Sequence, residues 1–449
     1  MCSDNLDWTR RSARDIAIEV RERRALVEEI AATTLERIAS RTAIGAWAHV
    51  DPQRVLSNAR TLDGTDLRNS PLAGMPVGIK DLMDSFDQPT TYGSPIYAGH
   101  RPAADAAIVA RLREAGALVI GKTVTTEFAY RCAGATLNPH HLGHTPGGSS
   151  SGSAAAVADF HVPVATATQT SGSVIRPASF CGVVGFKPTY GELPATGVKP
   201  CAESLDTVGL IARSVADIAY VRCALLLDDR QCASHALSSA PTVGLCRTAN
   251  WARADHAARE RLEACAAHLQ SAGARVVDLE LPDCCDGLLE SQRTILFFEM
   301  ARNFAAEALR HQELLSNDMR EAIAAGRSIS LDEYRRAQAH AERGRLALDT
   351  LLADFDFLLT LATPGEAPAG QSFTGDPIFN STWTLLHVPC LALPAGKGPG
   401  GLPLGVQLVA ARRQDEKLLQ WGAWAEAALT TLATGRGPAA VSSRASSKE

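Results

Sequence analysis

Apolar and polar residues are arranged in two patterns along the chain, one typical of helices and one of buried strands. Residues 11–40 place apolar side chains at helical spacing, which predicts one amphipathic helix, or two, lying against the body of the protein. Short apolar runs predict strands at 75–83, the end of 104–122, 162–170, 242–246, 274–281, 356–360, 390–396 and 405–410. Helical patterns cover the start of 104–122, then 151–160, 253–273, 286–353 and 414–430. Helices that alternate with strands predict an α/β fold, a layered sheet with helices on both faces.

The same pattern shows neither an internal repeat nor a linker before residue 432. We therefore expect one large domain over residues 1–432, with the helices of 11–40 packed on its body. Residues 433–449 are polar and rich in small side chains, which predicts a disordered tail.

Composition narrows the class of protein. The 449 residues have a formal net charge of −5, which gives no reason to expect nucleic acid or an anionic membrane surface as a partner. No apolar run approaches the roughly 20 residues needed to cross a bilayer. The N-terminal stretch has charges where a signal peptide would be apolar, and the 11 cysteines include no Cys-x-x-Cys pair. We therefore expect reduced thiols in a cytoplasmic protein.

Two segments rich in glycine and serine are the first candidates for chemistry: TPGGSSSGS at 145–153 and TATQTSGSVIR at 166–176. Residues 148–152 match the Gly-x-Ser-x-Gly nucleophile elbow of α/β-hydrolases, with Ser150 as nucleophile. That motif needs a buried strand directly before it, whereas the preceding NPHHLGHTPGG is typical of a loop. The loop N–H groups could form an anion nest, but the lysine of a nucleotide-binding loop is missing. HHLGH at 140–144 lacks the spacing of metal ligands, so we expect neither a metal nor a cofactor.

Lysine is rare in this chain, with seven lysines against 37 arginines. Lys80 follows the apolar run Pro76–Ile79, where a buried strand meets a loop. Burial lowers the pKa of a lysine by up to about 3–5 units, which leaves a neutral amine able to take a proton from a serine hydroxyl. The alternatives are a lysine that extends its ammonium group to solvent, or a salt bridge with Asp81 or Asp84.

Further segments accompany these motifs in a fixed order: GIKDLMD at 78–84, GKTVTTEFA at 121–129, TPGGSSSGSAAAVA at 145–158, TQTSGSVIRPASFCGVVGFKPTYG at 168–191 and SLDTVGLIARSVAD at 204–217. A late block follows, TGDPIFNSTWTLLHVPCLALPAG with GLPLGVQLVA. In these segments the chain resembles the amidase signature family, from residue 70 to residue 410 or so. The resemblance implies a single large α/β domain, with a mixed central β-sheet covered by helices on both faces.

The resemblance also implies roles for individual residues. Ser173 corresponds to the family's nucleophile, Lys80 to its base, and Ser149 to the bridging serine that follows a cis peptide bond. The oxyanion hole would consist of the backbone N–H groups of four consecutive residues: Thr170, Ser171, Gly172 and Ser173.

The remaining serines of the first segment have simpler expected roles. Ser150 corresponds to a serine that hydrogen-bonds the catalytic loop, and we include it among the substrate-site residues. Ser151 and Ser153 are expected to cap the alanine-rich helix that follows.

The second segment departs from the family's usual Thr-Asp-Thr-Gly-Gly-Ser-Ile-Arg. Gln169 replaces the aspartate, Ser171 replaces a glycine, and Arg176 lies three residues after Ser173 rather than two. This variant is similar to the malonamidase branch of the family, in which an arginine at this place receives the substrate's carboxylate. An Arg176 that pairs structurally with a nearby acid is the alternative.

From the resemblance we expect a hydrolase that cleaves C–N bonds of linear amides through an acyl-enzyme, with small carboxylate-bearing amides such as malonamate as candidate substrates. Carbamate or ester hydrolysis at the same site is one alternative. Another is the A subunit of a tRNA-dependent amidotransferase, against which the motif differences argue. The expected partner is thus a small-molecule amide or carbamate, without nucleic acid or membrane, and a homodimer is one option. Trp383, Phe297 and Phe298 are candidates for an apolar pocket wall, with core packing as the alternative.

Overall fold

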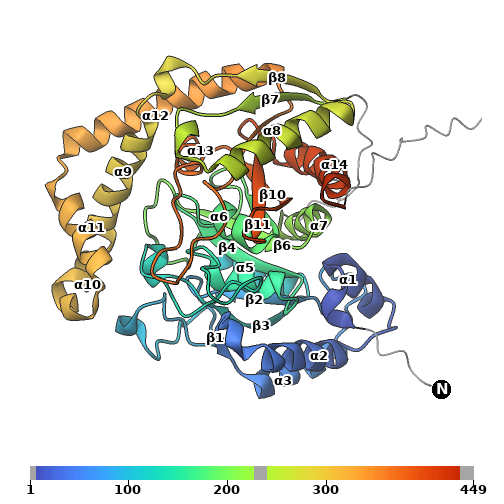
Figure 1. Cartoon of the computed structure of the whole chain (residues 1–449). Coiled ribbons are helices and arrows are strands. Elements are labelled where there is room, and N and C mark those ends of the chain that lie inside the picture. Colours follow the sequence, from blue (N-terminus) through green and yellow to red (C-terminus); the bar gives the residue numbers. More distant parts are fainter. Residues whose placement is uncertain (1–6, 227–239, 435–449) are drawn as a thin grey trace, which may run out of the picture.

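A single central sheet organises the computed structural model, which describes residues 7–226 and 240–434 (Figure 1). Its strands are β1 (Trp47–Val50), β2 (Pro76–Lys80), β3 (Leu118–Thr123), β4 (Val164–Gln169), β5 (Val184–Lys187), β6 (Thr207–Ala212), β7 (Thr242–Cys246), β8 (Arg275–Leu279), β9 (Phe357–Leu361), β10 (Cys390–Lys397) and β11 (Pro403–Val409). In the described part of the chain these form one 11-stranded sheet, in the order β1-β3-β2-β4-β6-β5-β10-β11-β9-β7-β8.

The sheet is mixed. β2 lies between β3 and β4 and is parallel to both, and β7 is parallel to its neighbours β8 and β9. The strands from β4 to β9 across the middle of the sheet pair antiparallel, as do β1 and β3 at one edge. Every residue of β2 and β4 is buried, as expected for parallel strands that helices cover on both sides.

Helices cover both faces of this sheet. They are α1 (Ala13–Arg21), α2 (Val27–Ser40), α3 (Pro52–Asp63), α4 (Ala107–Glu114), α5 (Ser151–Ala158), α6 (Ile175–Cys181), α7 (Val215–Leu226), α8 (His256–Ser271), α9 (Leu288–Asn303), α10 (Ala305–Arg310), α11 (Asn317–Ser328), α12 (Leu331–Leu351), α13 (Ser381–Leu385) and α14 (Asp415–Thr434). The apolar sides of α4, α7, α8 and α14 share one core with the sheet, and those of α5, α6 and α9 share the other. The predicted fold class is confirmed: one mixed α/β domain with helices on both faces.

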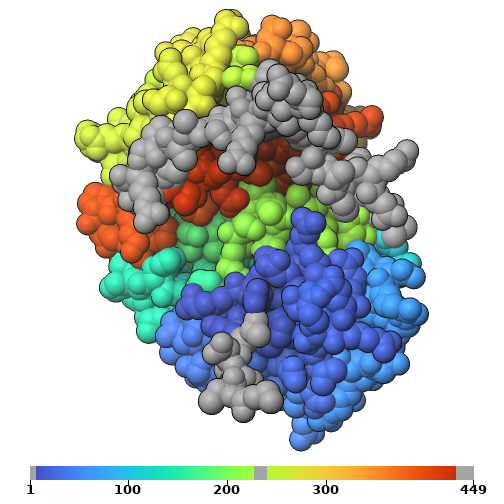
Figure 2. Space-filling model, turned by 90° about the vertical axis from the view of Figure 1, so that its right-hand side faces the viewer, coloured from blue at the N-terminus to red at the C-terminus, as the bar shows by residue number. Residues whose placement is uncertain are grey.

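The two ends of the chain's described part occupy different regions of the molecule. The blue N-terminal segments lie at the bottom of the face in Figure 2, and the yellow and orange segments after residue 240 lie at its top. This arrangement follows from the strand order, because β1 and β8 are the two edges of the sheet. Residues 11–40 form two helices, α1 and α2, rather than one.

The C-terminal boundary differs from the expectation. α14 extends to Thr434, so the predicted limit at residue 432 falls inside a helix. The predicted disordered tail, 433–449, otherwise lies outside the described residues. None of the helices that the structure describes is long and apolar enough to cross a bilayer.

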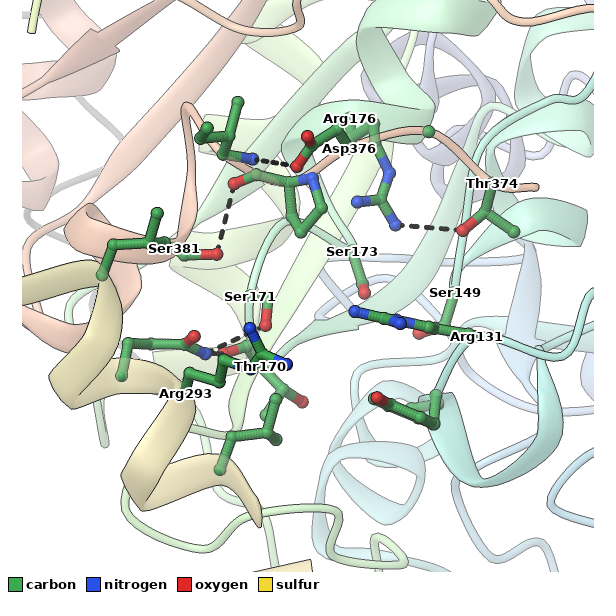
Figure 3. Close-up of a pocket in the computed structure, with 18 of the residues that line it drawn as sticks. Arg131, Ser149, Thr170, Ser171, Ser173, Arg176, Arg293, Thr374, Asp376 and Ser381 are labelled. Carbon is green, nitrogen blue, oxygen red and sulfur yellow. Dashed lines mark hydrogen bonds between the residues drawn. The ribbon is translucent and has the colours of Figure 1, made fainter. Parts of the chain in front are cut away.

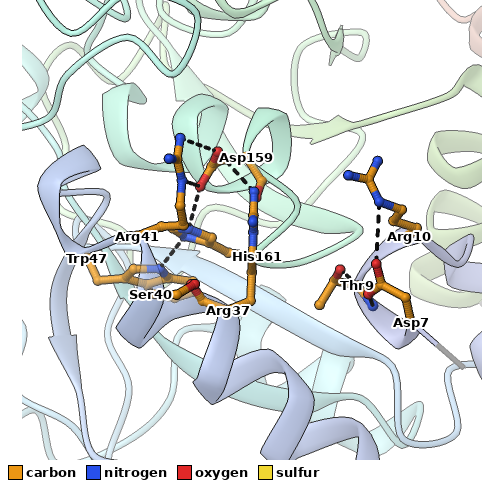
Figure 4. Close-up of polar contacts among 9 residues, drawn as sticks. All are labelled: Asp7, Thr9, Arg10, Arg37, Ser40, Arg41, Trp47, Asp159 and His161. Atoms are coloured by element: carbon orange, nitrogen blue, oxygen red, sulfur yellow. Dashed lines mark hydrogen bonds and ion pairs between the residues drawn. The ribbon is translucent and has the colours of Figure 1, made fainter. Parts of the chain in front are cut away.

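A buried carboxylate fastens the N-terminal helices to the body of the protein (Figure 4). Arg41 donates to both oxygens of Asp159, at 2.9 and 3.0 Å, and Arg37 donates to its carbonyl at 2.9 Å. His161 also contacts Asp159, at 3.0 Å, and Trp47 donates to His161 at 3.0 Å. Burial opposes ionisation of Asp159, but these hydrogen bonds outweigh it and lower its pKa to about 2. Since Asp159 follows α5 directly, α2 holds one end of the helix whose other end follows Ser149.

Candidate active site

Lys80 is the last residue of β2, and its side chain is completely buried. Its Nζ atom lies 2.7 Å from Ser149 Oγ, 2.7 Å from Thr168 Oγ1 and 3.0 Å from Ser150 Oγ. The backbone N–H of Lys80 donates to Thr166 Oγ1 at 2.9 Å, which ties the end of β2 to β4. All four partners are hydroxyl groups, so the structure surrounds this lysine with neutral dipoles.

This setting favours a neutral amine. Burial lowers the pKa of Lys80 from its usual 10.5 to about 7. The salt bridge considered from the sequence is not formed, because Asp81 pairs with Lys122 at 3.1 Å and Asp84 accepts a tyrosine hydroxyl. A neutral amine has a lone pair, so Lys80 is placed to accept the proton of Ser149 Oγ.

The glycine- and serine-rich loop enters α5 through a cis peptide bond between Gly148 and Ser149. α5 then approaches the sheet closely: a Cβ on Gly152 would lie 2.2 Å from the carbonyl oxygen of Ala46, so only glycine fits. Residues 145–150 form a loop where a nucleophile elbow would require a strand. The elbow with Ser150 as its nucleophile is therefore not what this segment builds.

The serines that follow Ser149 make structural contacts. Ser150 Oγ bonds Lys80 and also a carbonyl of β4, at 3.3 Å. Ser151 donates to Val124 O at 3.3 Å, and Ser153 donates to the Thr166 carbonyl at 2.8 Å. The prediction that Ser151 and Ser153 cap the helix is wrong, because α5 begins at Ser151 and both hydroxyls turn to neighbouring carbonyls.

Gln169 supports the loop that joins β4 to α6. Its Oε1 accepts the N–H groups of Val174, at 2.9 Å, and Ile175, at 3.1 Å, at the start of α6. Its Nε2 donates to Thr384 Oγ1 at 3.0 Å, and that hydroxyl donates to the carbonyl of Ser171 at 2.7 Å. Gln169, which departs from the family pattern, thus bonds the start of α6 directly and is connected to Ser171 of the predicted oxyanion loop through Thr384.

The backbone of that loop presents free donors. Across the described ranges, nothing in the chain accepts from the N–H groups of Thr170, Ser171, Gly172 and Ser173. A Cβ on Gly172 would lie 2.5 Å from Asn380 Oδ1, so the close packing behind the loop requires glycine. Free, aligned N–H groups are the donors that stabilise an oxyanion, and this role stays a prediction for these four.

Ser149 and Ser173 line one cavity of about 390 Å³ (Figure 3). The cavity is also lined by α9 and by the segment 373–378, which packs against Gly148 and Gly172. Arg293, from α9, and Arg131 extend into the cavity from different walls (Figure 3). Charged side chains of both signs line it: Arg131, Arg176, Arg253, Arg293, Glu290 and Asp376.

Arg176 lines the cavity with a buried side chain, and it has no ion-pair partner within the described ranges. Its guanidinium donates to the carbonyl of Gly148 at 2.8 Å and to Thr374 Oγ1 at 3.3 Å, while its Nε has no partner there. Burial lowers the pKa of Arg176 to about 10, and Asp376 acts in the opposite direction. The structural ion pair considered from the sequence is therefore not formed, and the cation lies beside both Gly148 and the cavity.

The three aromatic residues considered for the pocket wall lie in different places. Phe297 lines the cavity, Trp383 is buried in the wall of a different cavity, and Phe298 stacks on Tyr334 at 4.2 Å between ring centres. Gln292 was missed: its Nε2 donates to the carbonyl of Thr170 and to Ser171 Oγ, from a position more than a hundred residues along the chain. No local pattern around Gln292 signals that contact.

The histidines of the HHLGH segment contact each other. His141 and His144 meet through their Nδ1 atoms at 2.9 Å, and His140 bonds a backbone carbonyl. Within the ranges that the structure describes, no three histidine, cysteine, aspartate or glutamate side chains gather as metal ligands do.

Solved structures and curated proteins match this chain over most of its length. A solved structure described as an amidase superposes with a TM-score of 0.83 at 30% identity, over 93% of this chain and 99% of that one. The A subunit of the glutamyl-tRNA(Gln) amidotransferase of Acidothermus cellulolyticus is 32% identical over 94% of this chain and 95% of its own length. Its counterpart in Symbiobacterium thermophilum is 33% identical over 88% of this chain and 92% of its own.

These relatives correct two expectations. A hydrolase of small carboxylate-bearing amides is wrong as the main function, because these curated relatives, which cover about nine tenths of the chain, are A subunits of glutamyl-tRNA(Gln) amidotransferases. The expected partners, a small molecule without nucleic acid and at most a second copy of the chain, are wrong for the same reason. The motif differences at Gln169 and Ser171 do not exclude that alternative.

The match to a family model establishes which family the chain belongs to. The family model described as Amidase matches residues 29–419, which is most of the chain and includes every motif on which the resemblance depended. The similarity to the malonamidase branch in particular stays a prediction. The chain belongs to the amidase signature family and is an amide-cleaving enzyme.

Proposed function

We propose that this chain is the A subunit of a tRNA-dependent amidotransferase that acts on glutamyl-tRNA(Gln), and that it releases ammonia from an amide donor at Ser173. The observation that carries the proposal is the end-to-end similarity to curated A subunits, at 32% and 33% identity. The cluster of hydroxyls around the buried Lys80 supports the chemical half of it.

The amide is cleaved in two steps. Ser173 Oγ attacks the amide carbonyl while its proton passes to Ser149 Oγ, whose own proton passes to the neutral amine of Lys80 over 2.7 Å. The N–H groups of residues 170–173 receive the oxyanion. Return of the proton through Ser149 to the leaving nitrogen breaks the C–N bond and frees ammonia. Water then attacks the acyl group on Ser173 by the same route, releasing the acid and restoring the serine.

The cavity suits a donor with both an ammonium and a carboxylate group, such as an amino-acid amide. Arg176 is a buried cation beside the serines, and Asp376 provides the opposite charge in the same wall. A buried cation without an anion is costly, and a substrate carboxylate would relieve that cost. Ser150, which bonds Lys80 rather than facing the substrate, assists by orienting the amine. Glutamine has this arrangement of charges.

The cytoplasm is the proposed location, since the acceptor is a charged tRNA. Free buried thiols such as Cys181, Cys246 and Cys390 fit a reducing compartment.

The test is transfer of the amide. The tagged chain is purified with the proteins that accompany it, and the complex is given glutamine and glutamyl-tRNA(Gln). We expect conversion to glutaminyl-tRNA(Gln), lost in Ser173→Ala and retained in Ser151→Ala, a serine of the same region without a proposed role in the reaction. Carbamate and ester substrates are tested in parallel. A complex that hydrolyses these or simple amides but leaves glutamyl-tRNA(Gln) unchanged would refute the assignment to an amidotransferase.

A further inference from the structure

Asp206 lies directly before β6, against the predicted oxyanion loop. β4 and β6 pair antiparallel with Gln169 opposite Thr207, so the next position on each side brings Asp206 to Thr170. Thr170 Oγ1 donates to Asp206 Oδ1 at 2.5 Å. A charge-assisted hydrogen bond of this kind is short and strong, and it fixes the side chain that begins the loop.

The other carboxylate oxygen is also occupied. Asp206 Oδ2 accepts the backbone N–H groups of Cys201, at 2.7 Å, and Ala202, at 3.1 Å. The carboxylate therefore connects two loops, one leading to the nucleophile and one forming the cavity wall at Cys201. Burial raises the pKa of Asp206 to about 6, although the hydrogen bonds act in the opposite direction, so the group is ionised at neutral pH.

Asp206 is also connected to the active-site lysine. It bonds Thr170, and Thr168, two residues earlier in the chain, has its Oγ1 atom 2.7 Å from Lys80 Nζ. Burial lowers the pKa of Lys80, and the negative charge of Asp206 acts against that effect by favouring the protonated amine. The thiol of Cys201 is the other ionisable group nearby, and burial raises its pKa so far that it stays neutral. Asp81, the next residue in the chain, is held in its own ion pair. Glu299 of α9 acts on Asp206 rather than on the lysine.

We propose that Asp206 is a positioning residue with two effects: it fixes Thr170 of the oxyanion loop, and its negative charge limits how readily Lys80 gives up its proton. The inference rests on the proposed chemistry, in which Lys80 is the base. It does not depend on the identity of the amide donor or on the partner proteins.

The two effects oppose each other. Fixing Thr170 keeps its N–H aimed at the reacting carbonyl, which accelerates the reaction. The negative charge stabilises the ammonium form of Lys80, which removes the base from part of the enzyme near neutral pH. A variant that removes the charge should therefore lower the midpoint of the pH dependence, and a variant that removes only the Thr170 hydrogen bond should move it less, because the carboxylate remains.

The experiment measures the rate at which a fluorophosphonate labels Ser173 as a function of pH. This reaction needs the nucleophile and its base but neither tRNA nor a partner, so it works even if the amidotransferase proposal fails. Asp206→Asn keeps the shape of the side chain, and its amide can still bond both Thr170 and the two N–H groups. We expect the midpoint of the pH profile to fall by about 1 unit. Asp206→Ser gives a second variant without the charge.

Thr170→Val is the matched variant, because it keeps the carboxylate and loses the hydroxyl. Loss of this hydrogen bond raises the pKa of Asp206, so we expect a lower plateau rate with a midpoint that falls less than in Asp206→Asn, and recovery of both in Thr170→Ser. An unchanged or higher midpoint in both folded Asp206 variants would overturn the electrostatic half of the proposal. A Thr170→Val plateau equal to that of the wild type would overturn the positioning half.

Discussion

Two buried lysines end neighbouring parallel strands in this protein, and only one of them lies in the proposed active site. Lys80 ends β2 after Pro76–Ile79, and Lys122 lies near the end of β3 after Leu118–Gly121. Both side chains are completely buried. The register pairs Lys122 with Ile79, so alternation directs the two lysines to opposite faces of the sheet.

Their partners differ in chemistry. Lys80 meets only hydroxyls, those of Ser149, Ser150 and Thr168. Lys122 meets the carboxylate of Asp81 at 3.1 Å, a carbonyl oxygen at 2.6 Å and the hydroxyl of Thr90 at 2.6 Å. Burial lowers the pKa of both amines, and Asp81 opposes that effect only at Lys122. Hydroxyls can donate to a neutral amine, whereas a carboxylate only accepts and favours the ammonium form. Burial therefore favours a neutral base at Lys80, which has no carboxylate partner, and not at Lys122, which has one.

The largest expected effect separates the two lysines by reactivity. Lys80→Met should slow labelling of Ser173 by a fluorophosphonate by about 10²–10⁴-fold, because general-base assistance is lost. Lys80→Arg should not restore it, because the guanidinium stays charged. Lys122→Met, compared per folded molecule, should label at nearly the wild-type rate. Equal losses in folded Lys80→Met and Lys122→Met would remove the functional distinction.

The second effect separates them by stability. Lys122→Met should lower the free energy of unfolding by about 3–5 kcal/mol, since Asp81 is left buried without its counter-charge. Urea unfolding measures this loss. Adding Asp81→Asn should recover a large part of it, because the unpaired charge is then gone. A double variant as unstable as Lys122→Met alone would show that packing rather than the ion pair is at stake.

The third effect is the pH dependence of stability at Lys80. The pKa of Lys80 is about 7 in the folded chain and 10.5 in its usual state, so between these values the unfolded chain binds more protons. Stability from this site therefore rises with pH across that window. Relative to Lys80→Met, the wild type should gain about 4 kcal/mol from pH 7 to pH 10.5, at about 1.36 kcal/mol per unit. A flat difference across the window would mean that Lys80 keeps its proton when folded.

The smallest effect concerns single hydroxyl partners. Thr168→Val removes one hydrogen bond to Lys80 and should lower the labelling rate roughly fivefold, about 1 kcal/mol. Thr90→Val removes the equivalent partner of Lys122, 2.6 Å away, and should lower stability by about 1 kcal/mol while the rate stays unchanged. The opposite pattern, with Thr90→Val affecting the rate, would contradict the comparison.

The same pair of lysines shows how much of the site could be predicted from the sequence. The apolar run before Lys80 correctly predicted a buried strand, but it left open whether the lysine is a neutral base, reaches solvent or forms a salt bridge. The segments GIK and VIGK are also locally alike. The two lysines differ in their partners: Lys122 pairs with Asp81, and Lys80 bonds hydroxyls from residues 149–168. Those hydroxyls lie tens of residues away from Lys80 in the sequence. Only the family motifs singled out Lys80.

Elements fixed by distant contacts were missed for a related reason. α6 is short and contains Pro177, and its first N–H groups are satisfied by the Gln169 side chain rather than by a local capping residue. β1 is short and pairs with β3 through an irregular register, so it lacks a clear alternation. By contrast, β4 and α14 have long apolar or amphipathic patterns of their own, and both were predicted within a few residues.

The cavity is lined by different stretches of the chain, and this has a consequence for how the enzyme could change in evolution. The reacting groups lie within residues 80–173, whereas other lining residues come from α9 and 373–378. Mutations of α9 side chains that line the cavity alter the space offered to the substrate without touching the proton relay. Laboratory libraries at Leu296 and Phe297 would therefore vary substrate preference while leaving the acylation chemistry intact, whereas Thr374 is excluded because it bonds Arg176. Gln292 is an exception within α9, because it lines the cavity and also bonds Thr170 and Ser171 of the oxyanion loop. Substitutions at Gln292 would therefore affect the reaction as well as the substrate.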